Sequence, residues 1–172
     1  QLTLLILSFS SFLISSNGVI TVENISENGI HLFEIKRSRS IDKVVYQLNI
    51  NEFGNIETKN PLSVFWSNEV EKTIKPLTSI QQKFGYGTEI ISQKEQQISF
   101  KIIAIPYKIF VVRVNKDEIF KAYTAINNET AAIKSIYIKF EEGTTWSADI
   151  EKIDIHAITT INQKPITQTI RP

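Results

Sequence analysis

The sequence predicts an all-β fold: a single antiparallel barrel or closed sandwich of about eight to nine strands with one short helix. From residue 32 onward, apolar and polar residues alternate with a period of two, which is typical of half-buried strands. The alternating segments are short, rich in Ile, Val, Thr, Phe and Tyr, and separated by turn residues. A single segment carries both a helix start signal and a helix stop signal.

Three strands are predicted in the first part of the domain. Residues 32–38 (LFEIKRS) and 43–50 (KVVYQLNI) each place their large apolar side chains on one face. We expect them to form a hairpin, with residues 38–42 (SRSID) as its turn. The third strand covers residues 61–67 (PLSVFWS), where Pro61 occupies the first position and its missing N–H is tolerated.

The helix is predicted over the segment LTSIQQKFGYG. Thr78 is its expected N-cap, Gln81 the capping-box partner three residues on, and Gly85 the C-terminal stop. A helix of about two turns has little stability of its own. We therefore expect packing of Ile80 and Phe84 to hold it in place.

The remainder of the chain is predicted to return to strands. They cover residues 88–93, 97–105, 108–115, 118–126, 133–140 and 150–161, with a short edge segment over 165–170. Pro106 is expected at the bend between two of them. A closed barrel of about eight strands has an interior that side chains fill or that holds one small ligand. The sequence leaves both outcomes open.

Composition limits the classes of function. The chain has 172 residues, no Cys, only two His and a formal net charge of +1. These values exclude disulfides and zinc-thiolate sites, and they predict no metal, no cofactor and no nucleic-acid partner. The oligomeric state is left open. We expect one domain over residues 31–172, preceded by a lead-in over 19–30.

The N-terminus resembles the apolar core of a secretory signal peptide. Residues 2–14 are apolar and uncharged, but too short to span a bilayer comfortably, which takes about 20 residues. Ser16 and Gly18 satisfy the small-x-small rule for cleavage after Gly18. We expect residues 1–18 to be removed, leaving a secreted or periplasmic protein without a stable membrane span. The alternative is a first element buried within the domain.

No catalytic motif is present in the sequence. The segment FGYGTE has two glycines but lacks the further glycine and the Lys-Ser/Thr of a phosphate-binding loop. His156 alternates with Ile153, Ile155 and Ala157, so it is expected on the solvent side, and His31 is expected in a loop. No catalytic or metal-binding residue is predicted. Whether the protein is an enzyme stays uncertain, with the balance against.

Two arginines continue apolar faces of predicted strands. Arg37 follows Phe33 and Ile35, and Arg113 follows Ile109 and Val111. If those faces are internal, both guanidinium groups point to one side of the sheet and share an acidic partner or a bound anion, because a buried unpaired charge is costly. If they lie at strand ends, both reach solvent. The predicted ligand-binding residues are Arg37, Tyr46, Trp66, Tyr86 and Arg113.

Several segments resemble a family of bacterial secreted domains, domain of unknown function 4833. They are LFEIKRSRSIDKVVYQLNI, NPLSVFW, QQKFGYG, IFVVRVN, AAIKSIYI and INQKPITQTI, together covering most of residues 31–170. The residues that match its motifs are Arg37, Ser38, Tyr46, Trp66, Tyr86, Gly87 and Arg113. The resemblance implies an extracytoplasmic bacterial setting and supplies no activity.

These observations favour an extracytoplasmic β domain that binds a small, partly apolar or anionic ligand. The alternative is a structural or protein-interaction module of the cell envelope with a fully packed core. A hydrolase is the third possibility, and the small number of His and the lack of Cys argue against it. A large cavity favours the first hypothesis and a filled interior favours the second.

Overall fold

The computed structural model describes residues 29–141 and 150–172. The predicted signal peptide over residues 1–18 and nearly all of the lead-in over 19–30 lie outside the described residues. The described chain is mostly β. Its elements are β1 (Ile30–Arg37), β2 (Ser40–Leu48), β3 (Leu62–Asn68), β4 (Thr73–Pro76), α1 (Ser79–Gln81), the π-helical turn η2 (Gln82–Tyr86), β5 (Thr88–Lys94), β6 (Gln97–Ile102), β7 (Ile105–Val114), β8 (Phe120–Ile126), β9 (Glu129–Phe140), β10 (Ile150–Thr159) and β11 (Pro165–Ile170).

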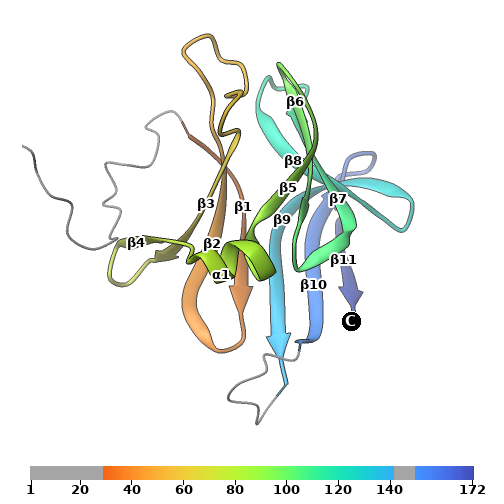
Figure 1. The fold of residues 1–172 in the computed structure, drawn as a ribbon. Helices are drawn as coiled ribbons and strands as arrows, with labels where there is room; N and C mark the ends of the chain where they lie inside the picture. The colour runs from red at the N-terminus through yellow and green to blue at the C-terminus, as the bar shows by residue number, and fades with distance from the viewer. Residues whose placement is uncertain (1–28, 142–149) are drawn as a thin grey trace, which may run out of the picture.

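All strands belong to one sheet that branches at β9 (Figure 1). Along one edge of β9, its first residues pair with β8 and its later residues pair with β1, while β10 pairs along the other edge. The order β4-β3-β2-β1 forms a first wing, and the order β8-β7-β6-β5 forms a second wing. The hairpin of β10 and β11 extends the sheet beyond β9. The two wings curl around a shared core.

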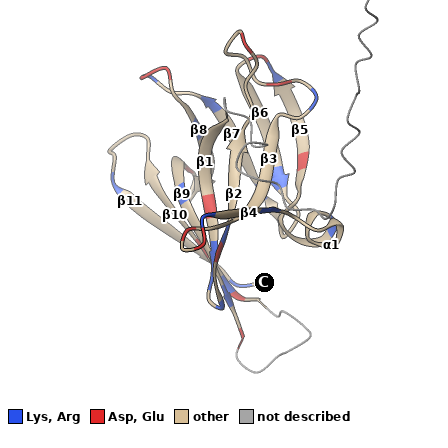
Figure 2. Cartoon of the chain, turned by 90° about the vertical axis from the view of Figure 1, so that its left-hand side faces the viewer, with Lys and Arg blue, Asp and Glu red and all other residues tan. Residues whose placement is uncertain are grey.

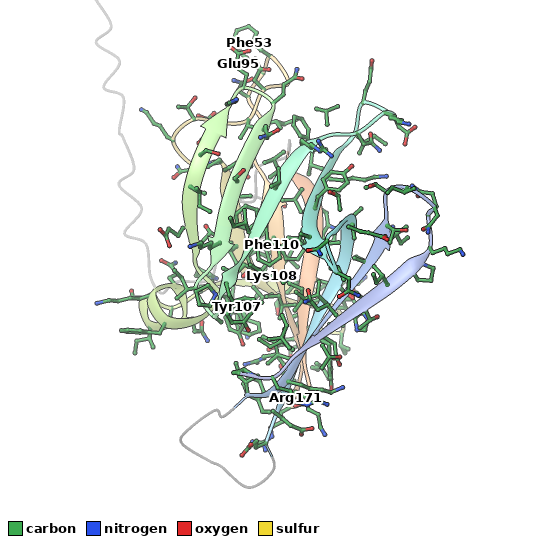
Figure 3. All side chains as sticks on the ribbon, turned by 90° about the vertical axis from the view of Figure 1, so that its right-hand side faces the viewer. Phe53, Glu95, Tyr107, Lys108, Phe110 and Arg171 are labelled. Carbon is green, nitrogen blue, oxygen red and sulfur yellow. The ribbon has the colours of Figure 1, made fainter. Side chains whose placement is uncertain are left out.

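The predicted closed barrel or closed sandwich is wrong, because the sheet is an open, curled half-barrel. In the described part of the chain, β4 and β5 pair with β3 and β6 but not with each other. The gap between the wings is crossed by α1 and η2 at one end. At the other end the Ile56 amide donates to the Glu95 carbonyl at 2.8 Å, and Figure 3 shows Phe53 and Glu95 together at that end.

The predicted purely antiparallel pairing is also wrong at one position, because β1 and β9 are parallel. Glu34 pairs with Ser135 and Arg37 with Ile138, about a hundred residues apart along the chain. A parallel pair needs a long connection, here the whole of both wings. The alternation of apolar and polar residues within β1 does not indicate which distant strand pairs with it.

The core is an aromatic stack that crosses from one wing to the other. Phe33 of β1 stacks on Tyr46 of β2 with ring centroids 4.7 Å apart and on Phe110 of β7 at 5.9 Å. Phe110 in turn stacks on Phe100 of β6 at 5.5 Å. All four side chains are completely buried, so the space between the wings is filled by side chains at this level.

The predicted capping box of the helix is confirmed. The Gln81 amide donates to the Thr78 hydroxyl at 3.3 Å, and the Thr78 amide donates to the Gln81 side-chain oxygen at 3.0 Å. The predicted packing of Ile80 and Phe84 is wrong, because they are 72% and 69% exposed. The buried Leu77 and Tyr86 flank the helical segment and anchor it instead.

The predicted stop at Gly85 is wrong as well, because the helical segment continues through η2 to Tyr86. The residue that must be glycine is Gly87, where a Cβ would lie 2.0 Å from the carbonyl oxygen of Gln82. The strands differ from the prediction in three further respects. β4 was not predicted, His31 lies inside β1, and Pro106 lies inside β7 after a turn at residues 103–104.

Candidate ligand-binding groove

The structure divides the five predicted ligand-binding residues between two places. Arg37, Tyr46, Trp66 and Tyr86 lie together at the end of the first wing beside α1. Arg113 is exposed on the outer face of the second wing, because the buried face of β7 carries Phe110 and Val112 instead. The expectation that both arginines point to the same side of the sheet is therefore wrong.

The Arg37 cluster is a set of mutual contacts within the protein. The Arg37 guanidinium lies 4.3 Å from the centroid of the Trp66 ring and donates a hydrogen bond to the Tyr86 hydroxyl. Trp66 and Tyr86 meet edge to face at 5.3 Å. The Trp66 indole donates to the Gln81 side-chain oxygen at 3.0 Å, and the Tyr46 hydroxyl donates to the Tyr86 carbonyl at 2.6 Å.

Burial governs the charge state of this cluster. Burial raises the pKa of the Tyr86 hydroxyl, although Arg37 acts in the opposite direction. Burial raises the pKa of the Tyr46 hydroxyl well above its ordinary value. Both hydroxyls are therefore protonated at neutral pH. In the described residues no carboxylate forms an ion pair with Arg37, and its buried Nε has no hydrogen-bond partner. The cluster ties the first wing to the capping box of the helix.

A separate groove lies on the outer face of the sheet, where Arg113 is found. Its volume is about 860 Å³. The lining residues come from β1, β7, β8, β9 and β10 and from the turns β7–β8 and β10–β11: His31, Leu32, Arg113, Val114, Asn115, Lys116, Asp117, Lys121, Tyr123, Ala132, Ile133, Lys134, Ile158, Thr160 and Gln163. We call this set the groove.

The groove combines an apolar set of side chains with a cationic set. The apolar side chains are all buried or half-buried: Leu32, Val114, Tyr123, Ala132, Ile133 and Ile158. The cationic side chains are all exposed: Arg113, Lys116, Lys121 and Lys134. Asp117 is the carboxylate among the lining residues. The whole chain has a formal net charge of +1, and Figure 2 shows both basic and acidic positions on its strands and loops, so the four-to-one excess of cations over carboxylates among the lining residues is local.

The hairpin of β7 and β8 positions two of these cations. The Asn115 side-chain oxygen accepts hydrogen bonds from the Asp117 and Ile119 amides, each at 2.9 Å, and this closes the turn. The register then places Arg113 directly opposite Lys121. The Arg113 guanidinium lies 5.1 Å from the centroid of the Tyr123 ring beneath it.

The groove cations share one surface, and two of them face each other across adjacent strands without an acidic partner in the described part of the chain. Elsewhere, Lys43 pairs with Glu34 and with Glu69, and three further ion pairs join neighbouring strands or positions. None of the four groove cations forms an ion pair with the described residues. Like charges directly opposite on adjacent strands destabilise a sheet. Folding alone therefore does not account for Arg113 facing Lys121.

Tyr123 contributes a hydroxyl to this surface. Burial raises its pKa, and although Arg113 acts in the opposite direction the net shift is upward. The hydroxyl thus remains a hydrogen-bond donor at neutral pH. With the surrounding ammonium and guanidinium groups, it suits recognition of a carboxylate, sulfonate or phosphate.

Sequence reasoning missed most of the groove. Lys121 could have been found, because the turn at residues 115–118 implies a hairpin that brings it opposite Arg113. Lys134 and His31 could not, because β9 and β1 reach the groove only through the branching of the sheet. Within the described ranges, no group of three or more His, Asp or Glu side chains could hold a metal ion.

The fold and the groove together define an all-β domain with an open, curled sheet and a cationic hollow on its outer face. The family model for Domain of unknown function (DUF4833) matches residues 33–169, so the chain belongs to that family. No curated protein and no solved structure matches the chain. Among the residues that the structure describes, no helix has the length and apolar character needed to cross a membrane.

Proposed function

We propose that this domain binds a small, partly apolar anion in the groove. Pockets that hold small ligands typically have volumes of about 300–1,000 Å³. The groove, at about 860 Å³, lies in this range. Its buried apolar side chains suit the apolar part of such a ligand, and its exposed cations suit the anionic group.

The observation that carries the proposal is the set of cations without acidic partners around an apolar floor. Arg113 and Lys121 face each other across adjacent strands, and Lys134 lines the same groove. A bound anion would relieve their mutual repulsion and accept hydrogen bonds from all three. Binding of an anion would therefore explain why these cations lie close together.

Anilinonaphthalene sulfonate tests the proposal, because it combines aromatic rings with one anionic group. Its fluorescence is titrated against the wild type and against a Lys121→Gln, Lys134→Gln double variant. We expect the double variant to bind about tenfold more weakly, since each exposed ion pair contributes up to about 1 kcal/mol. Lys75→Gln, a single charge change at an exposed lysine of β4, serves as the control and should bind like the wild type.

An unchanged affinity in the double variant would contradict the groove as the binding site. The packed-core interaction module would then be the better proposal. It has support of its own, because the interior is filled by the stack around Phe33 and Phe110. The exposed Ile80 and Phe84 also leave apolar surface on α1 and η2.

We also propose that the domain acts outside the cytoplasm. The support is the uncharged apolar run at residues 2–14, followed by Ser16 and Gly18. N-terminal sequencing of the protein from its source should show a mature chain that begins after Gly18. A mature N-terminus upstream of Ile14 would refute export by cleavage at this position.

A further inference from the structure

The register of the second wing aligns four side chains in one row across four strands. Lys94 of β5 is directly opposite Gln97 of β6, Gln97 is directly opposite Arg113 of β7, and Arg113 is directly opposite Lys121 of β8. Residues that are directly opposite in a sheet project from the same face. Since Arg113 is on the outer face, the whole row lies there. We call it the cationic row.

The row continues beyond the groove into a second hollow. This hollow has a volume of about 560 Å³, and it is lined by Lys94, Gln96 and Gln97 together with one carboxylate, that of Glu95. Arg113 and Val114 line both the groove and the second hollow. The two spaces therefore adjoin at Arg113, and a ligand in the groove has a direct path to Lys94.

The charges of the row are spaced for more than one anionic group. Strands in a sheet lie about 4.8 Å apart, so three strand spacings separate Lys94 from Lys121 by about 14 Å. In the described chain, neither residue forms an ion pair, and nor does Arg113 between them. One small anion held between Arg113 and Lys121 would leave Lys94 without a counterion.

We infer that the ligand carries two separated anionic groups joined by a partly apolar chain. The groove holds one anionic group and the apolar chain, and the second anionic group passes Arg113 to reach Lys94. This inference rests on the proposed function of the groove. It adds the class of ligand, a dianion of the α,ω-diacid type, and assigns the second hollow to the same site.

Dodecanoate and dodecanedioate provide a matched pair of probes, because they share a chain length and differ by the second carboxylate. A purely apolar site with a single anionic contact prefers the monoacid, since the diacid must desolvate a second charge. The dianion site predicts the opposite order. By isothermal titration calorimetry below the micelle-forming concentration, we expect the wild type to bind dodecanedioate about threefold more tightly than dodecanoate.

The variant that tests the second contact is Lys94→Gln. It should abolish the preference for dodecanedioate and leave the affinity for dodecanoate unchanged, while Lys75→Gln should retain the wild-type preference. Tighter binding of dodecanoate, or a preference for the diacid that survives in Lys94→Gln, would overturn the inference. If the inference fails in this way but Lys121→Gln weakens the binding of dodecanoate, the groove remains the proposed binding site for a single anionic group. If neither probe binds the wild type and the sulfonate titration is insensitive to Lys121 and Lys134, both proposals fail.

Discussion

Arg37 and Arg113 have similar local settings and opposite surroundings. Each lies at or near the C-terminal end of its strand, and each guanidinium covers an aromatic ring, Trp66 at 4.3 Å or Tyr123 at 5.1 Å. Arg37 is on the inner face and also donates to Tyr86. Arg113 is exposed on the outer face and opposes another cation, Lys121.

The difference shows that the environment decides what a cation over an aromatic ring contributes. Such a contact contributes about 0.5–1 kcal/mol at an exposed site and about 2 kcal/mol or more when water is excluded. The Nε of Arg37 is buried, so its contact with Trp66 belongs to the second kind. Arg113 retains access to solvent and is available to a ligand. One guanidinium is therefore enclosed within the fold, and the other is exposed on the face of the proposed groove.

The same contrast separates the lysines of the two wings. On the outer face of the first wing, Lys43 pairs with Glu34 and Glu69, and Lys36 pairs with Glu34. On the outer face of the second wing, the cationic row has no such compensation among the described residues. On the outer face of β1 and β2, the lysines are thus paired with Glu34 or Glu69, whereas Arg113 and Lys121 face each other without a carboxylate between them.

The largest expected effect distinguishes the two arginines directly. Arg37→Leu should lower the free energy of unfolding by about 2 kcal/mol, because it removes the desolvated contact with Trp66 and the hydrogen bond to Tyr86. Arg113→Leu should change it by no more than about 0.5 kcal/mol, because an exposed side chain is lost together with its repulsion from Lys121. Urea denaturation measures both. Equal losses of stability would refute the assignment of separate roles.

A smaller effect is expected at the helix that adjoins the Arg37 cluster. Thr78→Ala should lower the free energy of unfolding by about 1 kcal/mol through loss of the N-cap. The Thr78 hydroxyl accepts from the Gln81 amide, and the Gln81 side chain accepts from the Trp66 indole, so near-ultraviolet circular dichroism of the tryptophans should change as well. Thr58→Ala, at an exposed threonine outside the helix, is the matched control. A denaturation midpoint identical to that of the control would contradict the role of the cap.

The smallest effect concerns pH and the paired lysines. Burial by itself raises the pKa of Glu34, but hydrogen bonds from Lys36 and Lys43 outweigh it and leave the pKa below its usual value. A carboxylate with a lowered folded-state pKa stabilises the protein above its unfolded-state pKa, and this contribution is lost as the pH falls through the folded-state value.

We therefore expect the wild type to be more stable than Glu34→Gln at pH 7, with the difference shrinking as the pH falls from 5 towards 3. Glu52→Gln, at an exposed loop glutamate, should track the wild type more closely over the same range. Chemical denaturation at each pH measures the difference. A gap between wild type and Glu34→Gln that stays constant with pH would show that the ion pairs with Lys36 and Lys43 do not stabilise the first wing.

Local features of the chain were predictable from sequence because they depend on neighbouring residues. The strands follow from alternation, and the capping box follows from the spacing of Thr78 and Gln81. Asn127 and Asn128 between β8 and β9 have the positive φ that a tight hairpin turn requires, and asparagine adopts this conformation readily. These features need no knowledge of the distant parts of the chain.

The inner face of each strand was predictable only where the two faces differ in polarity. In β1 the face opposite Phe33 and Ile35 carries Glu34 and Lys36, so the inward position of Arg37 was correctly predicted. In β7 both faces are apolar, with Ile109 and Val111 on one and Phe110 and Val112 on the other. Alternation alone cannot choose between two such faces.

Tertiary packing made that choice, and with it the location of the candidate site. Phe110 turns inward because it stacks between Phe33 of the first wing and Phe100 of β6, and this places Arg113 outside. The groove then exists because the sheet branches at β9, where parallel pairing with β1 brings in side chains from the start of the domain. Both events join residues that are far apart in sequence, and the free energy that selects them comes from burial of the shared core.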